Sequence, residues 1–483
     1  MGDNSTLVLF GARGNLSRIK LIPGLFHLDE AGKLSDEMKI VSVGRQSISP
    51  IEWENEIKDM LEKKFNKKYD LKVFARFIKR NIYQATLPED PDAFKKFSKL
   101  LLNDDRFPKN FAFFLSVRPS DFAKIVDQLA EENLLNEDKY WRRVLIEKPF
   151  GTNLKSAINL QSSISKHLKE TQIYRIDHYL GKSALQNILW TRFSNSIFEH
   201  MWNNEYIDHI QITNHETLGV GERTEFYDAT GALRDMTQSH LLQMLALTTM
   251  EKPKSFSPDD IRIEKIKLLK SIRPIPIDNI DKFAFRAQYK SGNIKKEGDV
   301  KGYLEELEND KSVVETYAAI KIFLDTPRWE NIPIYLRTAK RLNQSGTFIS
   351  IKFKNNEDNK NSGDNWLVFS IQPKESTYFE IQTKIPGLNE VDLRSTKLEG
   401  MNRLDQDEKI DAYETLMLDL LEGNQSRFLH IDEVKAAWTL IDPIIENWTN
   451  NKAKIHQYTA GTSDPKESEV IFENKNQFWK EEI

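Results

Sequence analysis

The chain of 483 residues is long enough for two large domains or three of ordinary size, each able to bury a core. Its 69 lysines and arginines against 73 acids give a net charge of −4, which argues against a general nucleic-acid binder. The lack of cysteine excludes disulfides, cysteine-ligated zinc, iron–sulfur clusters and a thiol nucleophile. No apolar run approaches the roughly 18 residues of a membrane-spanning helix, and Met1 is not followed by a secretory signal. We therefore expect a cytoplasmic protein with no nucleic-acid or membrane partner.

In the N-terminal third, short apolar runs alternate with helical patterns. Strands are predicted at Thr6–Phe10, Met38–Val43, Phe111–Val117 and Arg143–Ile146, and helices at Leu16–Glu30, Ile51–Lys64 and Ser120–Glu132. Ser120 is expected to cap the last of these helices. The alternation of strands and helices predicts a parallel, doubly wound sheet.

After about Asp177 the chain becomes rich in strand patterns. Strands are predicted at Ile207–Asn214, Ala284–Tyr289, Thr316–Leu324, Ile332–Arg337, Thr347–Phe353, Trp366–Ile371 and Thr377–Thr383, and helices at Asp407–Leu421 and Asp432–Asn450. Several of these strands alternate apolar and polar residues, which predicts a large, mostly antiparallel sheet with one covered face. The polar run Asn355–Asn365 is expected to be a solvated loop. We therefore expect an α/β domain over residues 1–176 and an α+β domain over residues 177–483.

The first predicted strand runs directly into Gly11-Ala12-Arg13-Gly14-Asn15-Leu16 at the start of a helix. Gly11 can adopt backbone angles that other residues avoid, and Gly14 lets a pyrophosphate approach the helix N-terminus. Only two of the three glycines of the usual dinucleotide pattern are present, so a plain strand-to-helix turn is an open alternative.

Arg45 follows the second predicted strand, where a dinucleotide-binding fold contacts the adenine ribose. An acid at this position binds the 2′-hydroxyl of NAD, whereas an arginine pairs with the 2′-phosphate of NADP. The sequence Gly44-Arg45-Gln46 contains no acid. We therefore expect NADP as the coenzyme, with NAD possible, and an ordinary exposed arginine is the alternative.

A polar cluster lies at Arg175–Lys182. Asp177 could orient a histidine and stabilise its charge. His178, Tyr179 and Lys182 offer donors that suit a phosphate monoester. The alternative is a solvated turn.

Two further residues are candidates for catalysis or binding. His240 opens the apolar stretch LLQMLAL and is either a general base or a buried core residue. Lys148 directly follows a predicted strand and precedes Pro149. It is either a ligand-binding residue at the carboxyl edge of the parallel sheet or an ordinary exposed lysine. None of the nine histidines lies in an H-E-x-x-H pattern, and we expect no metal site.

Eight segments carry a resemblance to a known family. They are GARGNLSRIKLIPGLF from Gly11, VGRQ from Val43, WRRVLIEKPFGTNL from Trp141, RIDHYLGKSALQNI from Arg175, YDATGALRDMTQSHLLQML from Tyr227, ETYAAIKIFLDTPRW from Glu315, IPIYLRTAKRL from Ile332 and DEVKAAW from Asp432. On these segments the chain resembles the glucose-6-phosphate dehydrogenase family along nearly its whole length, most of all the enzymes of lactic-acid bacteria.

The resemblance implies the oxidation of D-glucose 6-phosphate to 6-phosphogluconolactone with NADP or NAD, the first step of the oxidative pentose phosphate pathway. It also implies an N-terminal Rossmann domain, a second domain with a large antiparallel sheet, and homodimers formed through that sheet.

The resemblance also implies roles for individual residues. The residue matching His240 is the general base, and the one matching Asp177 pairs with it. The remaining positions bind the substrate (His178, Tyr179, Lys182, Glu216, Asp235, Lys340), the coenzyme (Gly11, Ala12, Arg13, Gly14, Asn15, Leu16, Arg45, Gln46) or both (Lys148, Pro149).

The chain departs from the family pattern at several of these positions. Asn15 replaces an aspartate, Ser183 follows the RIDHYLGK lysine in place of a glutamate, and Ser345 stands where a second cation often contacts substrate. Arg118 replaces the first residue of a proline pair after the FFLSV strand. Arg13 replaces a small hydroxyl residue and Ile19 a basic one, and these two changes leave the coenzyme preference open. Loss of the cation at Ser345 could raise the Michaelis constant.

Two other functions compete with this interpretation. One is a different sugar dehydrogenase of the same architecture, because the E-K-P motif recurs there. The other is a catalytically weakened homologue that senses NADPH or a sugar phosphate, which the changes at Asn15 and Ser345 would suit.

Overall fold

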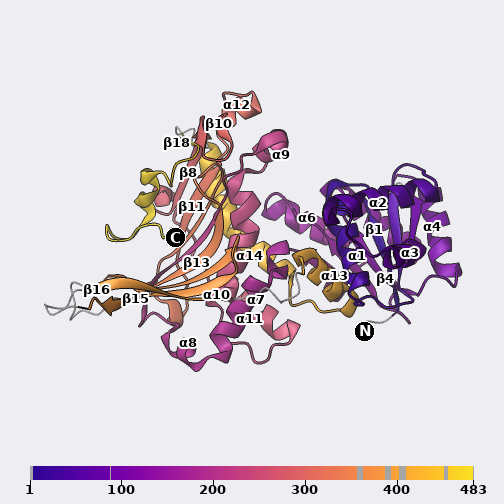
Figure 1. Ribbon diagram of the computed structural model, residues 1–483, viewed down its shortest axis with the longest axis horizontal. Coiled ribbons are helices and arrows are strands. Elements are labelled where there is room, and N and C mark those ends of the chain that lie inside the picture. Colours follow the sequence, from indigo (N-terminus) through magenta and orange to yellow (C-terminus); the bar gives the residue numbers. More distant parts are fainter. Residues whose placement is uncertain are drawn as a thin grey trace. The chain divides into compact units, whose positions relative to one another are not determined.

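The computed structural model describes residues 4–86, 89–355, 363–386, 393–401, 410–450 and 455–481. The chain divides into two units (Figure 1). The first comprises Met1–Gly181, Ser255–Arg262 and Lys409–Lys435, and the second comprises Lys182–Lys254, Ile263–Glu408 and Ala436–Ile483. Two later segments therefore return to the N-terminal unit. The expected boundary between residues 176 and 177 stays a prediction, and residues 356–362 of the expected solvated loop lie outside the described residues.

The first unit is built on a seven-stranded sheet in the order β17-β6-β5-β4-β1-β2-β3. The strands are β1 (Ser5–Phe10), β2 (Lys39–Gly44), β3 (Asn81–Ala85), β4 (Asn110–Leu115), β5 (Arg142–Ile146), β6 (Ile173–Ile176) and β17 (Phe428–Leu429). All neighbours pair in parallel except β17, which runs antiparallel to β6. The predicted parallel, doubly wound sheet is therefore confirmed.

Helices cover both faces of this sheet. They are α1 (Ile22–Glu30), α2 (Pro50–Phe65), α3 (Leu71–Arg80), α4 (Pro91–Asn103), α5 (Phe122–Glu131), α6 (Leu154–Ile164) and α13 (Ala412–Glu422). On one face Leu7 and Leu9 join a core with residues of α1, α2, α3 and α13. On the other face Phe10 packs on the rings of Phe94 and Phe97 of α4. Burial on both faces explains why β1 is apolar throughout.

Some local expectations for this unit were wrong or incomplete. Ser120 does not cap α5, because Pro119 starts a short 3₁₀ turn, Pro119–Asp121, that runs straight into the helix. Strands β3 and β6 were not predicted. In β6 the buried Arg175 interrupts the apolar run that would have indicated a strand.

The second unit contains a nine-stranded sheet in the order β16-β15-β14-β13-β7-β12-β11-β8-β18. The strands are β7 (Ile207–His215), β8 (Ala284–Lys290), β11 (Tyr317–Ile322), β12 (Ile334–Ala339), β13 (Gly346–Phe353), β14 (Trp366–Gln372), β15 (Ser376–Lys384), β16 (Leu393–Met401) and β18 (His456–Thr459), and β9 (Gly292–Ile294) and β10 (Gly298–Val300) form a separate hairpin. The sheet is mostly antiparallel, as predicted. Two neighbouring pairs, β12 with β7 and β18 with β8, run parallel.

The remaining helices are α7 (Ser183–Ser194), α8 (Ser196–Met201), α9 (Thr224–Asp228), α10 (Leu242–Thr249), α11 (Pro258–Lys270), α12 (Tyr303–Leu307) and α14 (Ile431–Asn450). A π-helical segment, η6 (Leu233–Leu241), leads into α10 and contacts β7 and β12. No helix among the described residues is long and apolar enough to cross a membrane.

Candidate active site

The turn after β1 is fixed by a close approach to β4. Gly11 has φ +78°, and a Cβ there would lie 2.0 Å from the carbonyl oxygen of Ser116. The backbone N–H groups of Gly11 and Ala12 both donate to the carbonyl of Val43, at 3.0 Å. The turn thus joins the carboxyl ends of three neighbouring strands, the edge at which parallel sheets bind ligands.

The helix that follows begins within this turn. Gly14 N donates to the carbonyl of Gly11 at 2.9 Å, and Ser17 Oγ donates to the same carbonyl at 2.9 Å. Ala12 is buried and Leu16 packs on the core, whereas Gly14 and Asn15 are exposed. The first N–H groups of a helix lack an intrahelical acceptor, so this exposed helix start can bind an anion.

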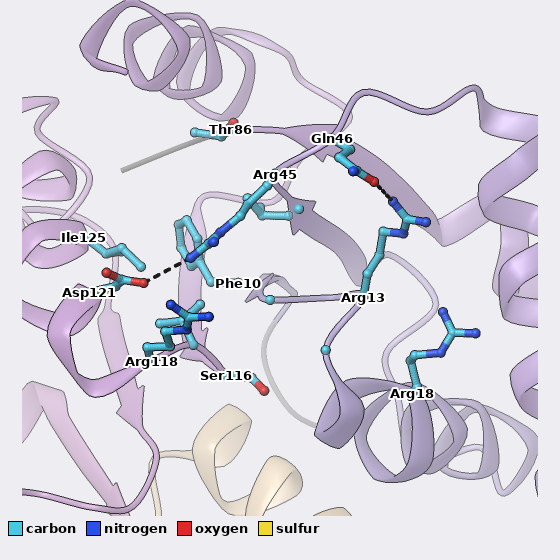
Figure 2. Close-up of a pocket in the computed structure, with 15 residues that line it drawn as sticks. Phe10, Arg13, Arg18, Arg45, Gln46, Thr86, Ser116, Arg118, Asp121 and Ile125 are labelled. Carbon is cyan, nitrogen blue, oxygen red and sulfur yellow. Dashed lines mark hydrogen bonds and ion pairs between the residues drawn. The ribbon is translucent and has the colours of Figure 1, made fainter. Parts of the chain in front are cut away.

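A cavity of about 630 Å³ opens beside the turn (Figure 2). Five of the expected coenzyme residues line it, namely Gly11, Arg13, Gly14, Arg45 and Gln46. Four arginines and a single carboxylate, Asp121, are among the lining residues, so the lining is strongly cationic. A cavity of this charge suits a ligand with several phosphate groups.

Two of these arginines form ion pairs with one acidic residue of α2. Arg13 forms an ion pair with Glu56 at 2.8 Å. It also donates to Gln46 Oε1 at 2.7 Å (Figure 2). Arg18 pairs with the same Glu56 at 3.3 Å. The bond from Arg13 to Gln46 therefore joins the turn after β1 to the segment after β2.

The other two arginines, Arg45 and Arg118, follow β2 and β4. Arg45 Nη2 lies 3.4 Å from Asp121 Oδ2, and its side chain is 63% exposed. Sequence reasoning assigned no coenzyme role to Arg118 or Asp121. Their position just after the carboxyl end of β4 could have indicated one, because that edge of a parallel sheet faces the ligand.

In the same unit, Arg175 joins the EKPFG and RIDHYLGK motifs. Its guanidinium, 1% exposed, donates to both carboxylate oxygens of Glu170, at 2.5 and 2.8 Å, and to the carbonyl of Leu429 at 3.1 Å. It also lies over the ring of Phe150, 4.8 Å from the centroid. One buried cation thus positions the segments that carry Lys148 and Asp177.

The residues after β6 form a short 3₁₀ turn, His178–Gly181. Asp177 is buried, and its Oδ1 accepts the N–H of Tyr179 at 3.0 Å. The ring of His178 stacks on that of Tyr413 from α13, with centroids 6.0 Å apart and planes 8° from parallel. No motif indicated Tyr413, which reaches this site from a distant segment of the chain.

Glu147 and Lys148 follow the carboxyl end of β5, and the Lys148–Pro149 peptide bond is cis. Burial of its carboxyl group raises the pKa of Glu147 to about 8, although hydrogen bonds from the Lys148 N–H and the Tyr413 hydroxyl oppose the rise. Below about pH 8 the Glu147 carboxyl group therefore holds its proton.

In the second unit, Glu216 and Lys340 lie side by side. They directly follow β7 and β12, a parallel pair in which His215 is opposite Ala339, so both side chains emerge at the same edge. Lys340 Nζ lies 2.5 Å from Glu216 Oε2 and over the ring of Tyr227. The pair presents a carboxylate and an ammonium group that can share the hydroxyls or phosphate of a sugar phosphate.

Asp235 and His240 both lie on the π-helical segment η6. His240 is 1% exposed, and Asp235 is half-buried. Glu315 holds the start of this segment, since its Oε1 accepts the N–H of Leu233 at 2.9 Å and its carbonyl accepts that of Ala232 at 3.1 Å. The sequence pattern around Glu315 gave no indication of this role.

Three further residues of interest have partners in this unit. Lys182 donates to Gln372 Oε1, and the adjacent Ser183 donates to Glu375 at 2.9 Å. Ser345 Oγ accepts the N–H of Thr217 at 2.8 Å. Ser345 therefore positions the loop after Glu216. The family pattern has a substrate-binding cation at this position.

The doubly wound sheet and the cationic cavity at its carboxyl edge are those of a dinucleotide-binding domain. A family model for the NAD-binding domain of glucose-6-phosphate dehydrogenase matches residues 8–187, and the model for its C-terminal domain matches residues 189–480. The chain belongs to the glucose-6-phosphate dehydrogenase family.

Individual relatives match over almost the full length. The glucose-6-phosphate 1-dehydrogenase of Chlamydia pneumoniae is 38% identical over 98% of this chain and 95% of its own, and that of Bacillus subtilis is 37% identical over 98% of each. A solved structure of glucose-6-phosphate dehydrogenase in complex with its substrate glucose-6-phosphate has a TM-score of 0.89 and 32% identity, covering 99% of both chains.

Proposed function

We propose that this protein oxidises D-glucose 6-phosphate at C1 to 6-phosphogluconolactone, with NADP+ as the preferred coenzyme. The observation that supports the proposal is the likeness over 99% of the chain to a structure obtained with glucose 6-phosphate. The alternative of a weakened sensor homologue is not favoured, because the chain retains both Asp177 and His240.

The cavity of the first unit fits a dinucleotide coenzyme. Its glycine turn needs close backbone approach, its helix start offers N–H groups, and its arginines balance phosphate charge. Residues Gly11–Leu16, Arg45, Gln46, Lys148 and Pro149 would hold the coenzyme. When bound, the coenzyme supplies the acceptor for the hydride that leaves C1.

His240 is proposed as the general base. As the C1 hydride departs, the C1 hydroxyl must lose its proton to form the lactone carbonyl, and the imidazole accepts that proton. Asp177 would hold the imidazole tautomer and stabilise the imidazolium that results. A base in this role contributes about 10²–10⁴-fold to turnover.

The remaining residues are proposed to bind the substrate. His178, Tyr179 and Lys182 would donate to the 6-phosphate. Glu216 and Asp235 would accept hydroxyl hydrogen bonds, and Lys340 would contact the sugar or its phosphate. Lys148 and Pro149 would contact both substrate and coenzyme.

The choice of NADP+ rests on Arg45. Its largely exposed guanidinium faces the cavity with one carboxylate partner, and no acid takes the position that would bind a ribose 2′-hydroxyl. An arginine there binds a 2′-phosphate through two parallel hydrogen bonds. Initial rates with NADP+ and NAD+ at saturating glucose 6-phosphate measure the preference directly.

We also propose a homodimer formed through the large sheet. Strand β16 is the edge strand next to β15, and it exposes Leu398 and Met401. Size-exclusion chromatography with light scattering tests the proposal, and the expected mass is twice the 56.3 kDa of the chain.

The decisive experiment compares wild type with His240→Asn. Wild type should reduce NADP+ with glucose 6-phosphate and show little rate with free glucose or other sugar phosphates. His240→Asn should lose at least 10²-fold in turnover while substrate binding, measured by calorimetry, is largely kept. Near-normal turnover in the variant contradicts the assignment of the base, and a broad sugar specificity contradicts the assignment of the substrate.

A further inference from the structure

Arg118 differs from the other three arginines of the coenzyme cavity in its partners. Arg13 and Arg18 share Glu56, and Arg45 faces Asp121. Within the described part of the chain, the Arg118 guanidinium has no recorded ion pair or hydrogen bond, and its side chain is exposed along the cavity wall. This leaves its donors available to a ligand.

Arg118 and Arg45 lie on the same side of the cavity. The N–H of Asp121 donates to the Arg118 carbonyl at 2.9 Å, and the Asp121 carboxylate lies 3.4 Å from the Arg45 guanidinium. Figure 2 shows the side chains of Arg45, Arg118 and Asp121 gathered at one end of the cavity, away from Arg13 and Arg18. Two cations are therefore placed around a single carboxylate.

This arrangement has the chemistry of a phosphate-monoester site. A phosphate monoester carries a charge of about −1.5 to −2 near neutral pH, which one guanidinium does not neutralise. Arginine is suited to it because its planar fork donates two hydrogen bonds to a phosphate. Arg45 and Asp121 alone would carry no net charge, whereas the addition of Arg118 gives a net charge of +1, which offsets half or more of the phosphate charge.

We propose that Arg118 is a second coenzyme-specificity residue, which binds the 2′-phosphate of NADP+ together with Arg45. The inference rests on the proposed use of NADP+ and extends it, because the sequence pattern assigned this role to Arg45 alone. Without the 2′-phosphate, the end of the cavity that holds Arg45 and Arg118 would face an uncharged ribose hydroxyl, so the contribution of Arg118 is specific to NADP+.

A different role for Arg118 would leave a different kinetic signature. A guanidinium can also stack on an aromatic ring, and the adenine ring is common to both coenzymes. Loss of a stacking contact would weaken NADP+ and NAD+ by the same factor. Loss of a phosphate contact changes the ratio of the two.

The test compares Arg118→Ala, Arg118→Lys, Arg45→Ala and the double alanine variant with wild type. Arg106→Ala is the matched control, since Arg106 is an exposed arginine of the same unit that pairs with Asp104 and does not line this cavity. Two readouts are measured for each protein. One is the ratio of kcat/KM for NADP+ to that for NAD+, and the other is calorimetric binding of adenosine 2′,5′-bisphosphate and of 5′-AMP.

We expect Arg118→Ala to lower the NADP+/NAD+ ratio at least tenfold and to weaken binding of the bisphosphate but not of 5′-AMP. Arg118→Lys should recover part of the loss, and the double variant should lose less than the product of the single losses because both arginines bind one group. An unchanged ratio, or equal losses for both coenzymes, overturns the inference. If wild type has no dehydrogenase activity, the proposed function fails, whereas the binding measurement still decides the role of Arg118.

Discussion

The ring of Tyr413 stacks face to face on the imidazole of His178, with centroids 6.0 Å apart and planes 8° from parallel. Tyr413 comes from α13, in the C-terminal segment that returns to the first unit, and the Gly181 backbone packs against the neighbouring Ala412. The proposed phosphate-binding histidine is therefore positioned by a part of the chain far from it in sequence.

Replacing Tyr413 with leucine should weaken substrate binding more than turnover. Aromatic stacking contributes about 0.5–1.5 kcal/mol, so we expect KM for glucose 6-phosphate to rise about two- to tenfold with kcat nearly unchanged. Tyr413→Phe keeps the ring and should stay close to wild type in KM. Tyr140→Leu, at an exposed tyrosine of the same unit, is the control. A fall in kcat at constant KM would contradict a positioning role.

Substituting Gly11 with alanine should abolish tight coenzyme binding. The residue has φ +78°, and its new Cβ would meet the Ser116 carbonyl oxygen at 2.0 Å, so the turn must move. Gly32→Ala is a matched control, because Gly32 has φ +66° but nothing within 4 Å of a Cβ. The control should lose about 1–2 kcal/mol of unfolding free energy from the backbone alone and keep coenzyme affinity. Equal coenzyme affinity in both variants would show that the turn after β1 does not hold the coenzyme.

The Arg175–Glu170 pair should matter for stability as well as for the site. Replacing Arg175 with methionine keeps the bulk but leaves Glu170 without its cation, which we expect to cost about 3 kcal/mol of unfolding free energy in urea titrations. Arg106→Ala, which breaks a solvent-exposed pair, should change stability much less. A loss in Arg175→Met no larger than that of the control would mean that the Arg175–Glu170 pair contributes no net stability.

The same pair predicts a pH dependence. Burial alone would raise the pKa of Glu170, but the hydrogen bonds and charge of Arg175 outweigh it and the pKa is lowered. A lowered pKa in the folded state means that the stabilisation is present above the ordinary glutamate value of about 4.3 and is lost as pH falls through the folded pKa. The acid loss of stability should therefore be smaller in Arg175→Met, and identical acid profiles would contradict this.

Much of the fold could be predicted because its strands are locally apolar. The runs at Thr6–Phe10 and Phe111–Val117 contain little but apolar residues, and the alternating pattern of Thr377–Thr383 indicated a sheet with one covered face. Strand β6 was not predicted because a charged residue interrupts its apolar run. The burial of Arg175 depends on the distant carbonyl of Leu429 as well as on the nearby Glu170, and the burial of a cation cannot be inferred from a local window.

The residues of the candidate site could likewise be predicted only where a local sequence pattern indicates them. Glycines and charged motifs at strand ends indicated the turn at Gly11 and the position of Arg45, since parallel strands collect their carboxyl ends at one edge. Tyr413 and Glu315 act on His178 and on the segment η6 through contacts between distant residues. Such contacts depend on the tertiary fold, so their residues carry no local pattern.

Glu147 should make the protein less stable as pH rises through the neutral range. Burial raises its pKa to about 8 in the folded state, against about 4.3 for an ordinary glutamate. Between these values the folded protein binds a proton that the unfolded chain has lost. This contribution to stability is therefore complete below about pH 4.3 and is lost as pH rises through 8, with a slope of at most about 1.4 kcal/mol per pH unit.

Glu147→Gln removes the titration, so its unfolding free energy relative to wild type should grow steadily from pH 5 to 8 in urea titrations. Glu131→Gln, at an exposed residue of α5, should show no such trend. A difference between Glu147→Gln and wild type that stays constant over this range would mean that the Glu147 carboxyl is already ionised in the folded protein, held so by Lys148 and the Tyr413 hydroxyl.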